Sequence, residues 1–218
     1  MISARTCTGL AMTLVLSLAA YPAAAITEVS NTTIGGSIAN GSINGTFGLA
    51  TSFTTDNATY RLDSASFPIH SNSSGTSDLR LYSDAPGQPG TLLEDLGTQA
   101  IGTGDHTFTW LSSGTTLGPD TTYWLVAGLT GSGDVQAYLL DSPNQTGNWT
   151  IGDQSLATNN HGTTWNPMSF GFAYDPMIFS VNATPQTSTS SVPEPATATL
   201  GLLALTAAAL TTIRRRVA

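Results

Sequence analysis

Two tryptophans in an asparagine-rich stretch carry the side chains best suited to ligand chemistry. Trp149 and Trp165 lie within Asn144–Met168, next to Asn148 and Asn166. The apolar face of a pyranose stacks on an aromatic ring, while its hydroxyl groups pair with amide side chains. These four residues therefore predict a carbohydrate-binding site. The alternative is that both tryptophans anchor the stretch onto the protein core, which is the more common role of large rings in loops.

Motifs that would support catalysis are absent from the sequence. His70, His106 and His161 are far apart, and none forms a metal-ligand pair such as His-x-His. Glu94 and Asp95 are adjacent acids, which on a strand point to opposite faces and make a poor facing dyad. The chain has no lysine, which excludes a P-loop and Schiff-base chemistry. We predict no catalytic residues and no enzyme, and keep a glycan hydrolase as a third alternative.

Two Gly-x-Gly-Asp stretches, Gly102–Asp105 and Gly131–Asp134, raise the question of a metal site. Glycine-rich stretches of this kind most often form hairpin turns. The alternative is a calcium site made of backbone and carboxylate oxygens, but the regular Asp-x-Asp-x-Asp-Gly spacing is absent. We therefore expect no metal and no cofactor, with calcium bound by loop acids as the alternative.

The charge of the central region excludes several classes of partner. Residues 26–191 contain 13 acidic residues, two arginines and no lysine, a formal net charge of −11. Nucleic-acid binding needs a basic surface, which this region lacks. The same acidity disfavours adsorption to anionic lipid headgroups.

The first 25 residues have the pattern of a signal peptide that a signal peptidase removes. Arg5 precedes an apolar run, Leu10–Ala20, which is too short to span a bilayer. Ala23 and Ala25 provide the small residues that the cleavage site requires. Cleavage also removes Cys7, the only cysteine, so we expect an exported chain without disulfides.

Short runs of β-branched and aromatic residues, separated by turn-forming residues, predict an all-β domain over residues 26–183. We expect an antiparallel, jelly-roll-like β-sandwich. Ser30–Gly45 is expected to be a loop-like or edge segment, and residues 184–192 a flexible linker. The predicted strands are Thr46–Thr54, Thr59–His70, Ser77–Ser83, Gly97–Ile101, His106–Leu111, Thr122–Leu129, Val135–Leu140, Ser169–Tyr174 and Met177–Ala183.

Two of these strands have informative patterns. Tyr123–Leu129 is apolar at both odd and even positions, which is typical of a central strand covered on both faces. Leu79 and Leu81 alternate with Asp78 and Arg80, which indicates a strand with one wet face.

The C-terminal segment, residues 193–218, combines a short motif, an apolar span and a basic cluster. The motif residues and the cluster are Val192, Pro193, Glu194, Pro195, Arg214, Arg215 and Arg216. The apolar residues 196–213 would form a helix about 27 Å long, just enough to cross a membrane, with the arginines on the cytoplasmic side. This segment resembles the PEP-CTERM sorting signal of Gram-negative bacteria. The resemblance implies processing by an exosortase, a membrane protease, and a link to exopolysaccharide and biofilm matrix.

The domain is similar to the choice-of-anchor R type of small surface domains. The residues that carry this similarity are Leu79–Gly97, with the sequence LRLYSDAPGQPGTLLEDLG, and Thr116–Leu129, with the sequence TLGPDTTYWLVAGL. The similarity covers about Phe47 to Val181 and implies no catalytic residues.

Together these patterns predict an exported, non-catalytic surface or extracellular-matrix protein. It would reside transiently in the inner membrane through its C-terminal helix, and then at the outer surface or in the matrix of a Gram-negative-type bacterium. The expected partners are signal peptidase, exosortase and exopolysaccharide, and nucleic acid is not among them. The alternative is a carbohydrate-binding module built on Trp149 and Trp165.

Overall fold

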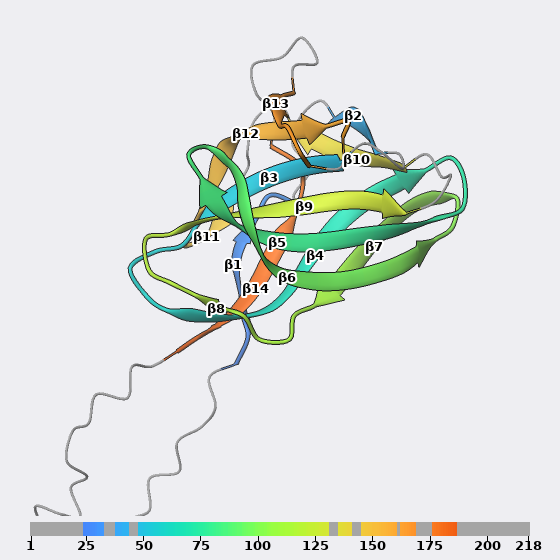
Figure 1. Cartoon of the computed structure of the whole chain (residues 1–218). Coiled ribbons are helices and arrows are strands. Elements are labelled where there is room, and N and C mark those ends of the chain that lie inside the picture. Colours follow the sequence, from blue (N-terminus) through green and yellow to red (C-terminus); the bar gives the residue numbers. More distant parts are fainter. Residues whose placement is uncertain are drawn as a thin grey trace, which may run out of the picture.

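The computed structural model describes residues 24–32, 38–43, 48–130, 135–140, 145–160, 162–168 and 176–186. Their regular elements are β-strands, which pair in two antiparallel sheets (Figure 1). This confirms the predicted all-β antiparallel sandwich. The predicted signal helix and the C-terminal helix at 196–213 lie outside the described residues. Within the described part of the chain, no helix is both long and apolar enough to cross a membrane.

The eight-stranded sheet is organised around one long strand, β4 (Tyr60–Ser71). β4 pairs with four other strands at successive positions along its length. Its direct partners are β7 (Gly104–Leu111), β8 (Thr116–Leu117), β10 (Val135–Leu140) and β14 (Ser180–Pro185). The sheet is completed by β1 (Ile26–Ser30), β2 (Ile38–Ile43) and β11 (Thr146–Gly147).

The six-stranded sheet has the strand order β13-β12-β3-β9-β5-β6. Its strands are β3 (Gly48–Thr54), β5 (Gly75–Ala85), β6 (Gln88–Ile101), β9 (Thr122–Thr130), β12 (Thr150–Thr158) and β13 (Asn166–Pro167). β5 and β6 form a hairpin that closes at the Ala85–Gln88 pair, where Gly87 has a φ of 76°. A positive φ favours glycine, which explains why glycine follows Pro86 in this turn.

A core rich in aromatic rings fills the space between the sheets. Phe53 from the six-stranded sheet stacks on Trp149, with ring centroids 5.3 Å apart and an interplanar angle of 8°. Phe67 from β4 stacks on Phe179 at 6.0 Å. Trp110 of β7 is also part of this core and is 2% exposed. Ring pairs of this kind contribute about 0.5–1.5 kcal/mol each beyond the area they bury, and they stabilise the two layers without a disulfide.

The outer face of the six-stranded sheet carries a second, smaller cluster. Trp124 and Val126 of β9 are buried there together with Leu156 of β12, and Trp165 packs against them. Leu125 of the same strand is buried in the main core. The prediction that β9 is a central strand covered on both faces is therefore confirmed.

Several sequence-based expectations need correction. The predicted wet face of β5 is wrong for Asp78, which is 3% exposed because its carboxylate packs over Gly128, its partner on β9, where it forms an ion pair with Arg80 at 2.9 Å. β12 lies in the stretch interpreted as a loop, because pairing with β3 outweighs its weak local preference for a strand. β14 extends to Pro185 and so includes the first residues of the predicted linker. The predicted strand Ser169–Tyr174 lies outside the described residues.

One carboxyl group is buried near the start of the domain. A bulge in β1 between Thr27 and Val29 accompanies an inward Glu28, which is 0% exposed. Neither of its carboxylate oxygens has a well-formed hydrogen bond within the described part of the chain. Burial, and secondarily the charge of Asp56, raise the pKa of Glu28, and the nearby Asn148 amide offsets part of this effect.

Glu28→Gln is expected to stabilise the mature protein at neutral pH. A carboxyl group whose pKa is raised by folding contributes stability below its unfolded pKa, and this contribution is lost as the pH rises through its folded pKa. The uncharged isostere removes that loss, so the melting temperature should rise by a few degrees at pH 7–8, where about 1 kcal/mol corresponds to roughly 2–4 °C. Thermal denaturation between pH 4 and 8 measures the effect, which should vanish at the acid end.

Glu94→Gln is the matched control with the opposite sign. Burial opposes ionisation of Glu94, but hydrogen bonds from Thr115, Ser113 and Ser112 outweigh burial and lower its pKa. The stability that this carboxylate contributes is present at neutral pH and is lost as the pH falls through its folded pKa. Glu94→Gln should therefore lower the melting temperature at pH 7. Equal shifts in both variants would contradict the assignment of Glu28 as a buried, destabilising charge.

Candidate functional site

The residues predicted to direct export lie almost entirely outside the described part of the chain. This applies to Ala23 and to the sorting residues Val192, Pro193, Glu194, Pro195, Arg214, Arg215 and Arg216. Ala25 is described and exposed, immediately before β1. The cleavage and sorting assignments therefore remain predictions as far as their geometry is concerned.

The structure does not bring Trp149 and Trp165 together on one surface. Trp149 is 0% exposed and lies in the main core, where Tyr60 contacts it edge-on at 4.9 Å. Trp165 belongs to the cluster on the outer face of the six-stranded sheet and is partly buried. Asn148 and Asn166 are exposed, but without a shared ring face. The hypothesis of a sugar platform built from both tryptophans is wrong, because the Trp149 ring is fully buried and stacks on Phe53 in the main core.

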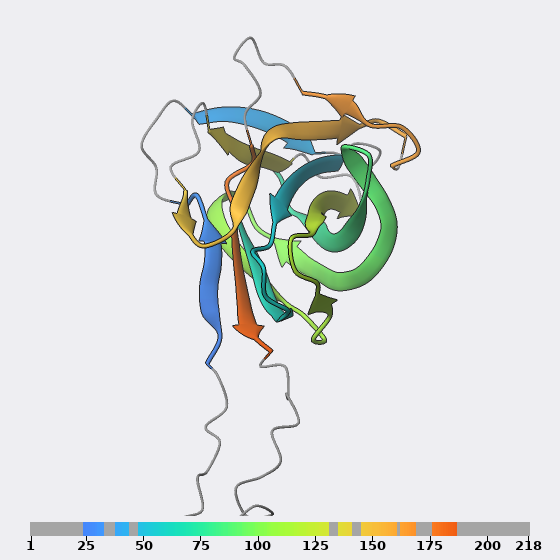
Figure 2. The same ribbon diagram turned by 90° about the vertical axis from the view of Figure 1, so that its left-hand side faces the viewer.

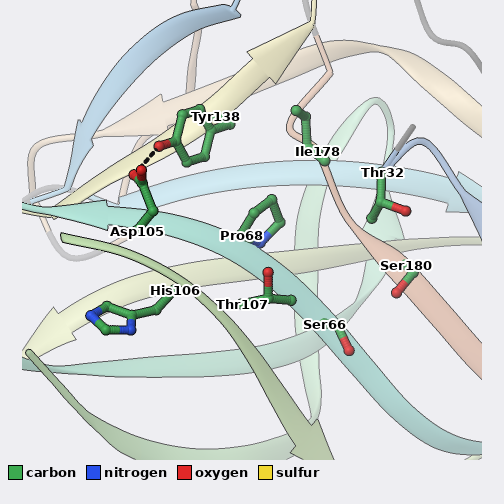
Figure 3. Close-up of a pocket in the computed structure, with 9 residues that line it drawn as sticks. All are labelled: Thr32, Ser66, Pro68, Asp105, His106, Thr107, Tyr138, Ile178 and Ser180. Carbon is green, nitrogen blue, oxygen red and sulfur yellow. Dashed lines mark hydrogen bonds between the residues drawn. The ribbon is translucent and has the colours of Figure 1, made fainter. Parts of the chain in front are cut away.

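A groove of about 700 Å³ lies on the eight-stranded sheet (Figure 3). Polar side chains line much of it: Thr32, Ser66, Asp105, His106, Thr107 and Ser180. Pro68, Tyr138 and Ile178 add apolar surface. The groove thus combines hydroxyl groups with a ring and aliphatic carbon, the mixture that sugar-binding surfaces use.

Strand alternation shows that the groove is on the face of the sheet turned away from the core. Phe67 and Ile69 of β4 are each 1% exposed and lie in the core cluster. Ser66 and Pro68 alternate with them and line the groove. Thr107 of β7, paired with Pro68, lines the same face.

The groove forms where β4 changes partners. β4 pairs with β14 up to Ser66 and with β10 from Ile69 onward. Pro68 falls between the two ladders, where a residue without an N–H is tolerated. The Ile178 N–H donates to the carbonyl oxygen of Tyr138 at 2.8 Å and links the segment before β14 to β10 across this gap.

A hydrogen-bonded network fixes Asp105 at one end of the groove. Asp105 lies opposite His70 in the β4–β7 ladder, and its Oδ1 atom is 2.7 Å from His70 Nδ1. The Tyr138 hydroxyl donates to the same Oδ1 atom (Figure 3). The bond from Tyr138, together with His70, lowers the pKa of Asp105, while Asp105 raises the pKa of Tyr138 to about 12. Hydrogen bonding to Asp105 also raises the pKa of His70.

The network holds these groups in place but does not activate a nucleophile. His70 Nε2 lies 3.3 Å from Asn72 Oδ1, so both ring nitrogens face amide or carboxylate oxygens instead of a serine hydroxyl. His106 Nε2 lies 3.2 Å from the carbonyl oxygen of Thr103. Among the described residues, no three histidine, cysteine or acidic side chains converge on a common point. The geometry suits ligand binding.

Sequence reasoning missed this groove. It noted His70, His106 and Asp105 without placing them together, and it gave no role to Tyr138. The detectable signal was Pro68 in the middle of a predicted strand, since proline inside a strand marks an interrupted ladder.

The comparison with known families concerns the C-terminal segment. Residues 191–216 match the PEP-CTERM protein-sorting motif. The PEP-CTERM motif indicates an exported bacterial protein that is targeted to an exosortase and to the cell envelope or surface. No curated protein matches the chain.

The fold gives the PEP-CTERM motif a defined point of attachment. β1 and β14 are antiparallel neighbours with Ile26 opposite Ala183, so the start of β1 and the end of β14 lie side by side (Figure 2). The motif begins six residues after Pro185. Ser180 lines the groove at the other end of the same strand, about 17 Å away at the usual rise per residue.

Trp149→Ala and Trp165→Ala are expected to differ strongly in stability. Truncating a fully buried tryptophan costs about 3–5 kcal/mol, whereas the partly buried Trp165 should cost about 1 kcal/mol. Urea denaturation followed by fluorescence measures both. A small and equal loss in the two variants would indicate that Trp149 is not part of the core.

Asp105→Asn is expected to lower the pKa of His70 toward its ordinary value. The carboxylate hydrogen bond that favours the protonated imidazole is weakened when the charge is removed. NMR titration of the His70 ring protons measures the shift. Asp153→Asn, an exposed acid on β12, changes the net charge equally and serves as the control. An unchanged His70 pKa in Asp105→Asn would contradict the network.

Proposed function

We propose that this protein is an exported, non-catalytic component of the cell surface or extracellular matrix that binds exopolysaccharide through the groove. The observation that carries the proposal is the groove itself, with hydroxyl groups and apolar ring surface on an open sheet face. Sugar polymers present hydroxyls at their edges and C–H groups on their faces, so they match both kinds of surface. The resemblance of the domain to choice-of-anchor R surface domains agrees with this role.

The composition of the groove supports binding without hydrolysis. Glycoside hydrolysis uses two carboxyl groups about 5–10 Å apart, one of them protonated. Among the described lining residues, Asp105 is the one carboxylate. Its pKa is lowered by the bond from Tyr138, which keeps it ionised and unsuited to donate a proton.

The PEP-CTERM motif supports the proposed route. The segment at 196–213 would hold the protein in the inner membrane until an exosortase acts on it, and the domain would then remain at the outer surface or in the matrix. The groove needs no cofactor in this scheme, because its hydroxyl groups and Asp105 bind sugar directly.

Exported mature protein is expected to be retarded in affinity gels that contain exopolysaccharide from the producing cells. Thr107→Trp should abolish the retardation, because the new ring fills the groove from an exposed strand position. Thr91→Trp, at an exposed position on β6, should leave it unchanged. Both variants should keep the β-sheet circular dichroism spectrum of the wild type.

The mixtures of protein and exopolysaccharide also test whether the protein cleaves the polymer and whether binding needs a metal ion. No reducing ends should appear on prolonged incubation, and EDTA should not weaken binding. Release of reducing ends would identify a hydrolase instead. Loss of binding in EDTA that calcium restores would show that the loop acids hold a cation.

A further inference from the structure

We infer that the groove selects uncharged polysaccharides over acidic ones, and that Asp105 is the residue that determines this specificity. The inference rests on the proposed function, because it takes the groove to be the polysaccharide site. It adds the chemical class of the ligand, which neither the sorting motif nor the fold specifies.

Only one of the two carboxylate oxygens of Asp105 is hydrogen-bonded to described residues. Its Oδ1 atom is held by His70 and Tyr138, whereas Oδ2 has no hydrogen bond within the described part of the chain. The side chain is 74% exposed and lines the groove. One oxygen is therefore fixed in position, and the other offers its lone pairs to a ligand. A carboxylate oxygen is an acceptor only, so the group that it binds is a donor such as a sugar hydroxyl.

Other lining groups complement this acceptor without adding charge. Thr107 and Ser180 carry hydroxyl groups with no hydrogen-bond partner among the described residues, and each can donate or accept. Pro68, near Thr107, and Tyr138, beside Asp105, add apolar surface to the groove (Figure 3). These are contacts for the ring and hydroxyls of a neutral sugar.

No cation is in place to receive an acidic polymer. The two described arginines are engaged elsewhere: Arg61 lies 2.9 Å from Asp63, and Arg80 lies 2.9 Å from Asp78. Neither arginine lines the groove. Since residues 26–191 contain no lysine and have a net charge of −11, a uronate carboxylate would approach Asp105 without a counter-charge.

Binding of the mature protein to immobilised polysaccharides at pH 8.5, above the ordinary titration range of imidazole, tests the inference. Dextran, mannan and galactan represent uncharged polymers, and polygalacturonate and alginate represent the acidic class. At 20 mM salt, at least one uncharged polymer should bind about tenfold or more tightly than either acidic polymer, because one unscreened like-charge contact is of that order.

Asp105→Asn assigns the selectivity to one residue. Affinity for the uncharged polymer should fall about tenfold, since the charged acceptor is lost. The ratio of the affinities for the uncharged polymer and for polygalacturonate should also decrease. Asp153→Asn alters the net charge by the same amount on the other sheet and should change neither quantity. Circular dichroism and melting temperature verify that both variants fold.

The outcomes separate the two proposals. If no polysaccharide of any class binds, the proposed function fails and this inference fails with it. If alginate or polygalacturonate binds as tightly as every uncharged polymer, polysaccharide binding stands and the inference alone is overturned. Equal effects of Asp105→Asn and Asp153→Asn would also overturn it, because the selectivity would then come from the overall charge.

Discussion

The pairing of β4 with four different strands is the constraint on which the rest of the structure depends. One face of β4 supplies Phe67 and Ile69 to the core, and the other supplies Ser66 and Pro68 to the groove. The break between its β14 and β10 ladders creates the hollow. Core and groove are thus two sides of one strand, so the register that packs the aromatic rings also sets the positions of the lining side chains.

Exposure outside the cell would normally favour a disulfide in a domain of this kind, yet Cys7 is the only cysteine. Stacked rings such as Phe53 and Trp149 stabilise the contact between the two sheets instead. The core also contains a buried acid, Glu28, whose carboxylate has no well-formed hydrogen bond to any residue that the structure describes. Asp78 is buried too, and burial raises its pKa, but the ion pair with Arg80 offsets part of this effect. The exposed acids therefore affect which partners the protein can bind, whereas a buried acid such as Glu28 lowers the stability of the fold.

The sequence predicted those parts of the fold that local patterns control. The inward Leu79 and Leu81 of β5 and the two-sided apolar pattern of β9 are each set by residues close together in the chain. β12 was missed because its pairing with β3 is a long-range interaction that outweighs a Gly- and Asp-containing sequence. The groove was missed for a related reason. Ser66, Thr107, Tyr138 and Ser180 are ordinary strand residues, and only the register of four strands brings them together.

The adjacency of β1 and β14 has a mechanical consequence. β14 lies between β1 and β4 and is hydrogen-bonded to both. If the groove holds a polymer as proposed, a pull on the chain beyond Pro185 acts along β14. Such a load strains the bonds of two ladders together instead of opening them one at a time. The strand that leads toward the sorting motif is therefore the one placed to resist shear.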